Sequence, residues 1–188
     1  MLSVFTGGEA LAVKVFAFLQ SVLYLISSLL FYPVVFLLVV LFFYVVYKLG
    51  VFVGEYALRR KGVYPFLSRY LEELDALISQ EADEVEIENL LQSWQQRMYL
   101  DLDKLRALVR VGPSLGLMGT LIPMGTGLAA LAKGQMEKLI SSMIIAFTTT
   151  VVGLAIAVIA YLLGAVKERW LEEEARLMEY YTEKRVKR

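Results

Sequence analysis

The sequence contains no cysteine and no histidine. Their absence excludes disulfide bonds, thiol nucleophiles, histidine metal ligands and the usual histidine general base. A charge excess is missing too, because 19 lysines and arginines balance 19 aspartates and glutamates among the 188 residues. Without a basic excess we expect no nucleic acid partner. The chain is instead rich in apolar residues, which make up 58%, and its mean hydropathy of +0.60 excludes an ordinary water-soluble enzyme.

Three apolar runs are long enough to cross a bilayer, which takes a helix of about 20 residues. The first covers 32–54 with Lys48 as its one charge, and the runs 111–132 and 139–166 carry none. Unbroken runs of this length indicate helices, because a helix satisfies its own backbone groups in lipid. The sequence therefore predicts an all-α membrane protein embedded in the lipid bilayer. Its transmembrane helices are expected within 32–56, 107–132 and 139–166.

The first 31 residues allow two interpretations. The segment 10–31 is apolar, but Lys14, Ser21 and Ser28 recur every seven residues and fall on one helical face. A helix with such a polar stripe can lie in the plane of the membrane surface. It can also span the membrane if the stripe packs against protein. We favour an N-terminal interfacial helix in residues 1–31 and keep a fourth span as the alternative.

The distribution of basic residues predicts the orientation. Eight lie in 55–110 and seven follow residue 166, whereas the connection between the second and third spans holds two, Lys133 and Lys138. Basic residues accumulate on the cytoplasmic side. We therefore expect 55–110 and the C-terminus in the cytoplasm, the N-terminus outside, and the protein in the cytoplasmic (inner or plasma) membrane.

The sequence also predicts helices in the regions outside the spans. Apolar residues recur at spacings of three and four from Pro65 to Ile78, and again from Asp83 up to Gly112 without a breaker. The second stripe predicts one long helix that continues into the second span. A further stripe after the third span predicts its continuation through 167–188. Antiparallel packing of these extensions, 57–106 and 167–188, would form a cytoplasmic helical bundle.

The second and third spans each present a face of small residues. Such faces let helices approach closely in lipid, and helix packing is their most economical interpretation, with pore lining in an oligomer as the other. The residues on these faces are Gly112, Gly116, Gly119, Pro123 and Gly127 in the second span, with Thr126 beside them, and Ala146, Gly153 and Ala157 in the third.

Neither 111–132 nor 139–166 contains an Asp, Glu, Lys, Arg or His. A chain that carried protons alone would be expected to have an ionisable group in the membrane. Hydroxyls can only donate and accept hydrogen bonds around such a group, so a titrating carboxylate would have to come from another polypeptide. The hydroxyls available for this are Thr120 and Thr126 in the second span and Thr148, Thr149 and Thr150 in the third. The same absence argues against an intramembrane enzyme, and we expect no catalytic residue, cofactor or metal.

Two stretches resemble the motifs of a known family. Gly112-Pro-Ser-Leu-Gly-Leu-Met-Gly-Thr120 is similar to the second-span motif of the MotA/TolQ/ExbB proton-channel proteins, and Ile145-Ala-Phe-Thr-Thr-Thr-Val-Val-Gly-Leu154 is similar to their third-span motif. The resemblance covers roughly 105–170 at the level of motifs and the whole chain at the level of a three-span plan.

The resemblance implies a ring-forming oligomer, a homopentamer around a dimer of a single-span partner of the ExbD/TolR/MotB type. The partner's intramembrane Asp would be protonated and deprotonated as ions flow, converting the proton-motive force into movement. Thr120 and Thr150 occupy the positions of the family's two span threonines beside that Asp, and Thr149 and Gly153 would flank it. One departure is Ile145, where the ExbB and TolQ branch has a Glu.

Flagellar MotA proteins have four spans and a larger cytoplasmic domain, so this chain is closer in size to ExbB and TolQ. The resemblance therefore implies an ion-driven stator subunit, with its load and the choice between H⁺ and Na⁺ left open. From the residues alone, a non-conducting structural membrane scaffold remains the alternative.

Overall fold

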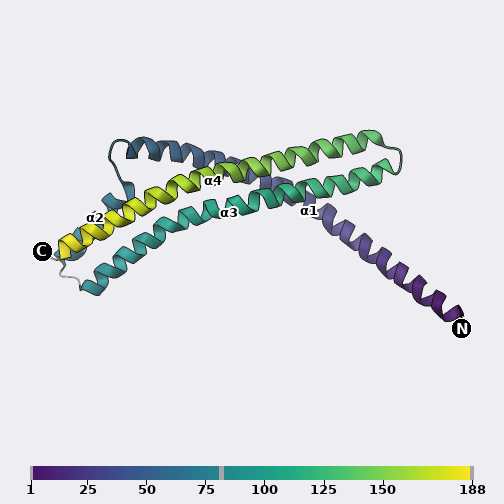
Figure 1. Cartoon of the computed structure of the whole chain (residues 1–188), viewed down its shortest axis with the longest axis horizontal. Helices are drawn as coiled ribbons and strands as arrows, with labels where there is room; N and C mark the ends of the chain where they lie inside the picture. The colour runs from purple at the N-terminus through teal and green to yellow at the C-terminus, as the bar shows by residue number, and fades with distance from the viewer. Residues whose placement is uncertain (1, 81–82, 187–188) are drawn as a thin grey trace. The chain divides into compact units, whose positions relative to one another are not determined.

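The computed structural model describes the backbone of residues 2–80 and 83–186 and the side chains of 13–80 and 83–185. These residues form four helices and no strand: α1 (Leu2–Arg59), α2 (Pro65–Ser79), α3 (Glu84–Leu131) and α4 (Met136–Val186) (Figure 1). The all-α prediction is therefore confirmed. Three stretches are long and apolar enough to cross a membrane, namely Val13–Arg59, Glu84–Leu131 and Met136–Arg185.

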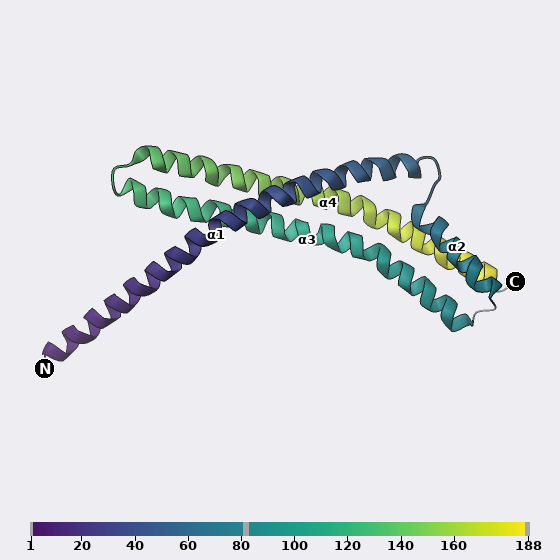
Figure 2. The ribbon, with the colours of Figure 1, turned by 180° about the vertical axis from the view of Figure 1, so that it is seen from behind.

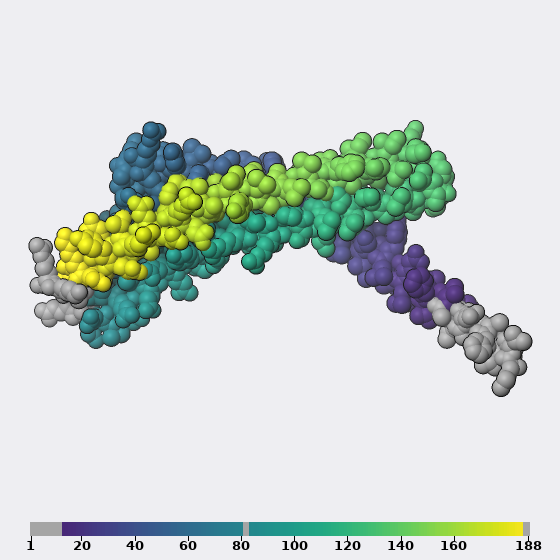
Figure 3. Space-filling model, viewed as in Figure 1, coloured from purple at the N-terminus to yellow at the C-terminus, as the bar shows by residue number. Residues whose placement is uncertain are grey.

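The helices are divided between two compact units. The first comprises Met1–Val40 and Ser114–Gly153, and the second comprises Leu41–Pro113 and Leu154–Arg188. In each unit α3 and α4 lie side by side and antiparallel (Figures 1 and 2), and their side chains are in contact in the space-filling view (Figure 3).

Helix α1 differs from the expected division at residue 31. It runs unbroken from Leu2 to Arg59 with Pro33 in its interior. No glycine occurs between Glu9 and Leu49, and a single proline removes only one helical hydrogen bond, which membrane helices tolerate. Residues 2–31 are thus not a separate helix. Whether they lie in the interface or span the bilayer stays a prediction.

The long helices α3 and α4 agree with the uninterrupted stripes of the sequence. One helix continues from the polar region into the apolar run 111–132, and another continues from 139–166 to Val186. Both helix ends that carry a left-handed glycine have the same cap. Gly62 (φ 77°) follows α1 and Gly134 (φ 72°) follows α3. In each case the next residue's N–H reaches back to a carbonyl five residues earlier, at 3.3 Å for Val63 and 3.0 Å for Gln135.

In the first unit, glycines allow α3 and α4 to approach closely. A Cβ added at Gly119 would lie 2.7 Å from the Cβ of Thr149, and one at Gly116 would lie 3.2 Å from the Thr149 carbonyl oxygen. A Cβ at Gly127 would lie 3.0 Å from the Cβ of Ser142. At Gly119 a methyl group would collide with Thr149, and at Gly116 and Gly127 the neighbouring atoms would have to shift by a few tenths of an ångström. The small face of α3 is therefore a contact with α4.

The second unit has a conventional apolar core. Helix α2 contributes Leu67, Tyr70 and Leu74, all of which are buried. They pack with residues of α3 and α4, namely Ile87, Trp94, Met98, Leu102, Leu171 and Met178. The predicted packing of the extensions into a helical bundle is therefore confirmed. Their cytoplasmic location stays a prediction.

A buried carboxylate attaches α2 to this core. Glu174 of α4 is fully buried, and its Oε2 accepts the backbone N–H groups of Phe66 (3.1 Å) and Leu67 (3.0 Å). Pro65 has no N–H, and the Ser68 N–H binds the Tyr64 carbonyl at 3.1 Å. Every amide of the first turn that could lack a partner is thus satisfied, and the negative charge lies at the positive end of α2.

The same carboxylate pairs with Arg59, at the end of α1. The Arg59 guanidinium lies 4.8 Å from the Trp170 ring and donates through Nη2 to Glu174. Its Nε and Nη1 are buried and have no partner among the described residues. Glu174 is therefore the charge that makes burial of Arg59 tolerable, and the pair joins α1, α2 and α4.

Glu174→Gln tests this connection. The substitution keeps the shape but leaves a buried guanidinium without its counter-charge, so we expect a loss of about 3–5 kcal/mol in the free energy of unfolding. The matched control is Glu172→Gln on the exposed surface of α4, which should change stability by less than about 0.5 kcal/mol. Unfolding of the detergent-solubilised protein measures both. Equal effects of the two substitutions would contradict the assigned role of Glu174.

Gly119→Ala tests the contact between α3 and α4. The new methyl group would collide with Thr149, so we expect destabilisation of about 1–3 kcal/mol. Gly125→Ala, on the same helix, meets no atom within 4 Å and should be neutral or stabilise by up to about 1 kcal/mol through helix propensity. Thermal unfolding in detergent measures the difference. If Gly119→Ala is as stable as Gly125→Ala, the close approach is wrong.

Candidate ion pathway

Some of the predicted site residues are buried in the contact between α3 and α4, and others lie beside that contact. Buried in the first unit are Gly116, Gly119, Pro123, Gly127, Ala146, Thr149 and Gly153, and buried in the second unit are Gly112 and Ala157. Thr120, Thr126 and Thr150 are half-buried. The small-residue faces are therefore internal contacts of one chain, and a role in lining a pore stays a prediction.

The antiparallel arrangement places Thr120 and Thr150 on one side of the pair. Each follows a contact residue by one position, since Thr120 follows Gly119 and Thr150 follows Thr149. One residue turns a helix by about 100° in a fixed sense. On two antiparallel helices, the same step along each chain leads to the same side of the pair. The two motif threonines thus lie together at one edge of the contact.

Helix α1 lies on the opposite side. Thr126 precedes the contact residue Gly127, and Ile145 precedes the contact residue Ala146. One step backward along a helix turns it by about 100° in the opposite sense. Thr126 and Ile145 therefore lie on the side of the pair away from Thr120 and Thr150. Both line a groove of about 270 Å³, to which α1 contributes Ser28, Phe31 and Tyr32. Ile145, which replaces the glutamate of the ExbB and TolQ branch, therefore lies on the α1 side, and α1 leaves the side of Thr120 and Thr150 uncovered.

The hydroxyl groups differ in what they can still bind. Thr120 donates to the Leu117 carbonyl (2.7 Å), and Thr126, Thr148 and Thr149 donate likewise to carbonyls of their own helix at 2.8–2.9 Å. The Thr150 hydroxyl has no hydrogen-bond partner in the part of the chain that the structure describes. Thr120 can thus accept a further hydrogen bond, and Thr150 can both donate and accept.

Thr149 occupies a different environment from its neighbours. Its side chain is 8% exposed and lies directly under Gly119. This position makes Thr149 part of the contact between α3 and α4. A role of Thr149 in the ion pathway stays a prediction. Among the described residues, no three His, Cys, Asp or Glu side chains gather to hold a metal ion.

The second unit holds a set of ion pairs that the sequence patterns did not reveal. Lys48 lies 3.7 Å from Asp101, and Lys167 lies 3.0 Å from Glu55. Lys48, the one charge of the first apolar run, therefore has a partner within the chain. Burial raises the pKa of Asp101, yet a hydrogen bond from Lys104 and the charge of Lys48 outweigh it, so the pKa falls below its usual value.

One signal in the sequence could have identified the buried pair. Glu174 falls on the apolar stripe formed by Leu171, Ala175 and Met178, where a charged residue needs a partner. The pattern alone could not name Arg59 as that partner, because 115 positions separate the two residues.

Comparison with known proteins identifies the family. The model of the MotA/TolQ/ExbB proton channel family matches residues 59–180, a range that includes both threonine motifs and the buried Glu174. No curated protein and no solved structure matches the chain. The family match covers more than half of the sequence and agrees with the multi-pass, all-helical fold, and the chain therefore belongs to the MotA/TolQ/ExbB proton channel family.

Proposed function

We propose that this chain is the channel subunit of a stator driven by the proton-motive force. It assembles as a homopentamer around a dimer of a single-span partner of the ExbD/TolR/MotB type, whose intramembrane Asp gains and loses the ion. The observation that carries this proposal is the placement of Thr120 and Thr150 on one uncovered side of the α3–α4 pair. Family membership supports the same proposal.

The chemistry of the spans explains why a partner is required. The apolar runs 111–132 and 139–166 contain no titratable acid or base, so this chain cannot bind the transported proton within them. The partner's carboxylate would face Thr120 and Thr150. An ionised Asp at mid-bilayer costs about 2.5–3.5 kcal/mol on insertion scales. Hydroxyl groups lower that cost when the Asp is ionised, and protonation removes it.

The energy of the membrane potential is of the right size for such a cycle. One elementary charge crossing the membrane gains about 2.3 kcal/mol per 100 mV, comparable with the cost of the unpaired Asp. In our proposal, a protonated partner moves past the apolar wall of the ring and an ionised partner is held beside the hydroxyl groups. Sodium ions can be coordinated by the same hydroxyls, so the proposal covers either ion.

The arrangement of α1 fits an outer position in the ring. Its aromatic side chains Phe36, Phe43 and Tyr47 are exposed, as expected of a helix that faces lipid. We further propose that 55–110 and the C-terminal tail lie in the cytoplasm and the N-terminus outside, because basic residues concentrate in those two regions. The membrane would be the cytoplasmic membrane.

A non-conducting scaffold explains the packed glycines equally well. It gives no reason for two half-buried threonines on the same side of the pair, one of them with an unused hydroxyl donor. Conduction and the presence of a partner distinguish the two functions.

Thr150→Val in the reconstituted complex tests the pathway. The substitution keeps the shape but removes the hydroxyl, and we expect ion flux to fall roughly 10-fold or more, because a hydrogen bond to a charged group contributes about 1.5–3 kcal/mol. Thr148→Val is the matched control, since Thr148 is turned about 200° away from Thr150 and should leave flux unchanged. A dye-based proton flux assay in vesicles measures both. Unchanged flux in Thr150→Val would remove Thr150 from the pathway.

The mass of the purified complex tests the assembly. We expect a pentamer of this chain when it is expressed alone, and the addition of two copies of a single-span, Asp-containing protein when the two are co-expressed. Native mass spectrometry of the detergent-solubilised complex gives both numbers. A closed oligomer that never retains such a partner would favour the scaffold.

A further inference from the structure

The side chain of Arg59 has two hydrogen-bond donors that no described residue satisfies. The side chain is 10% exposed, and its Nη2 donates to Glu174, but Nε and Nη1 are buried and have no partner. Trp170 lies beside the guanidinium and attracts its charge, yet an indole ring has no strong acceptor atom. Buried polar groups are nearly always bonded, either to protein or to ordered water. The two N–H groups therefore require an acceptor.

A small cavity of the second unit lies at Arg59. Helix α1 contributes Arg59 and Glu55 to its lining, α3 contributes Met98 and Asp101, and α4 contributes Lys167. The volume of the cavity is about 10 Å³. A single water molecule needs about 10–15 Å³, so the size of the cavity suits water and is too small for an organic ligand.

The lining of this cavity provides acceptors as well as donors. Asp101 binds Lys104 and faces Lys48 through Oδ1, and its Oδ2 accepts no hydrogen bond from the residues that the structure describes. Two cations and two carboxylates line the cavity, so their formal charges cancel and do not favour an ion. A neutral molecule that accepts from Arg59 and donates to Asp101 matches the lining, and water has both capacities.

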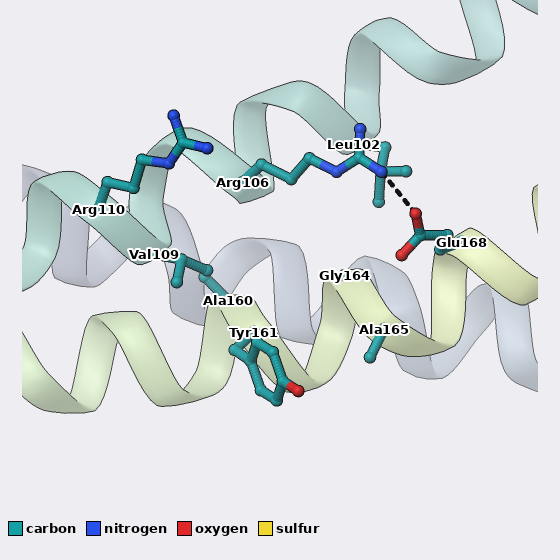
Figure 4. A pocket seen from close by; sticks show the side chains of 9 residues that line it. All are labelled: Leu102, Arg106, Val109, Arg110, Ala160, Tyr161, Gly164, Ala165 and Glu168. Carbon is teal, nitrogen blue, oxygen red and sulfur yellow. Dashed lines mark hydrogen bonds and ion pairs between the residues drawn. The ribbon is translucent and has the colours of Figure 1, made fainter.

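The larger groove of the same unit has its charges matched within the chain. It has a volume of about 350 Å³ and lies between α3 and α4 (Figure 4). Its Arg106 pairs with Glu168 across the groove and with Asp103 on its own helix. Among the side chains that the structure describes, only Arg59 has buried N–H groups without a partner. The smaller cavity is therefore the place where a bound molecule is required.

We propose that the cavity beside Arg59 binds one water molecule, which accepts a hydrogen bond from the Arg59 guanidinium and donates one to Asp101 Oδ2. A bridging water is enthalpically nearly as favourable as a direct hydrogen bond, and buried waters of this kind make two to four such bonds. The water connects the Arg59–Glu174 pair to the Lys48–Asp101 pair. One polar network then joins α1, α3 and α4. This proposal does not depend on ion conduction.

Radiolytic hydroxyl labelling read by mass spectrometry tests the site, because radiation converts a bound water into a radical that labels the side chains next to it. Met98 lines the cavity, whereas Met178 belongs to the same core but does not line it. Both methionines are 0% exposed. In the detergent-solubilised full chain we expect Met98 to be labelled several-fold faster than Met178. Equal labelling of the two would overturn the proposal.

Arg59→Lys tests which group holds the water. The substitution keeps a positive charge for Glu174 and removes Nε and Nη1, so labelling of Met98 should fall to the level of Met178. Arg60→Lys, at the exposed neighbouring position, is the matched control and should leave the labelling of Met98 unchanged. If Met98 is labelled equally fast in Arg59→Lys and in the unchanged protein, the assignment to Arg59 is wrong.

A high-resolution crystal structure of the unchanged protein gives a test that does not depend on how a variant folds. We expect a density peak within hydrogen-bonding distance of both the Arg59 guanidinium and Asp101 Oδ2. A cavity without density would overturn the proposal. An anomalous peak at this place in crystals soaked with sodium bromide would do the same, because it would identify an anion site.

Discussion

The close approach of α3 and α4 at their glycines is the constraint on which the candidate site depends. Lipid is as apolar as the helices, so association in the membrane relies on van der Waals contact and shape. Gly116 and Gly119 provide the shape, because Thr149 occupies the space that a side chain there would need. Once the pair is locked in an antiparallel contact, the rotation of each helix is fixed. Thr120 and Thr150, each one residue after a contact residue, then lie on the same side of the pair.

Polar groups follow different rules in the two units. In the first, hydroxyls are the polar side chains of the packed spans, and most of them bind carbonyls of their own helix. In the second, the charged side chains are paired: the buried Glu174 with Arg59 and two amides, and the half-buried Lys48 and Lys167 with Asp101 and Glu55. Burying a charge is tolerable only with such compensation. The apolar runs 111–132 and 139–166 contain no charged residue that could provide such compensation. In the proposed function, a partner therefore supplies the ionising group and hydroxyl groups stabilise it.

Much of the fold could be predicted from the sequence because its signals are local. Apolar runs without charge identify helices in a bilayer, and the uninterrupted stripe from Asp83 onward predicts that α3 continues through Gly112 and Pro113. The boundary placed at residue 31 did not correspond to a helix end, since a polar stripe says which face a helix presents and not where the helix stops. The family motifs identified Thr120 and Thr150 for the same reason: they are short, contiguous and carried on uncharged spans.

The sequence by itself determined the helices, their apolar lengths, the absence of titratable groups in two spans and the identity of the motif threonines, all of which are properties of single segments. Only the tertiary structure decided that Thr149 packs under Gly119 while its neighbour Thr150 lies at the edge of the contact. It also decided that Ile145 shares a groove with α1 and that Arg59 compensates Glu174 across 115 positions. The physical reason is that these relations depend on which faces of distant helices meet, and the contact between two helices is set jointly by both surfaces.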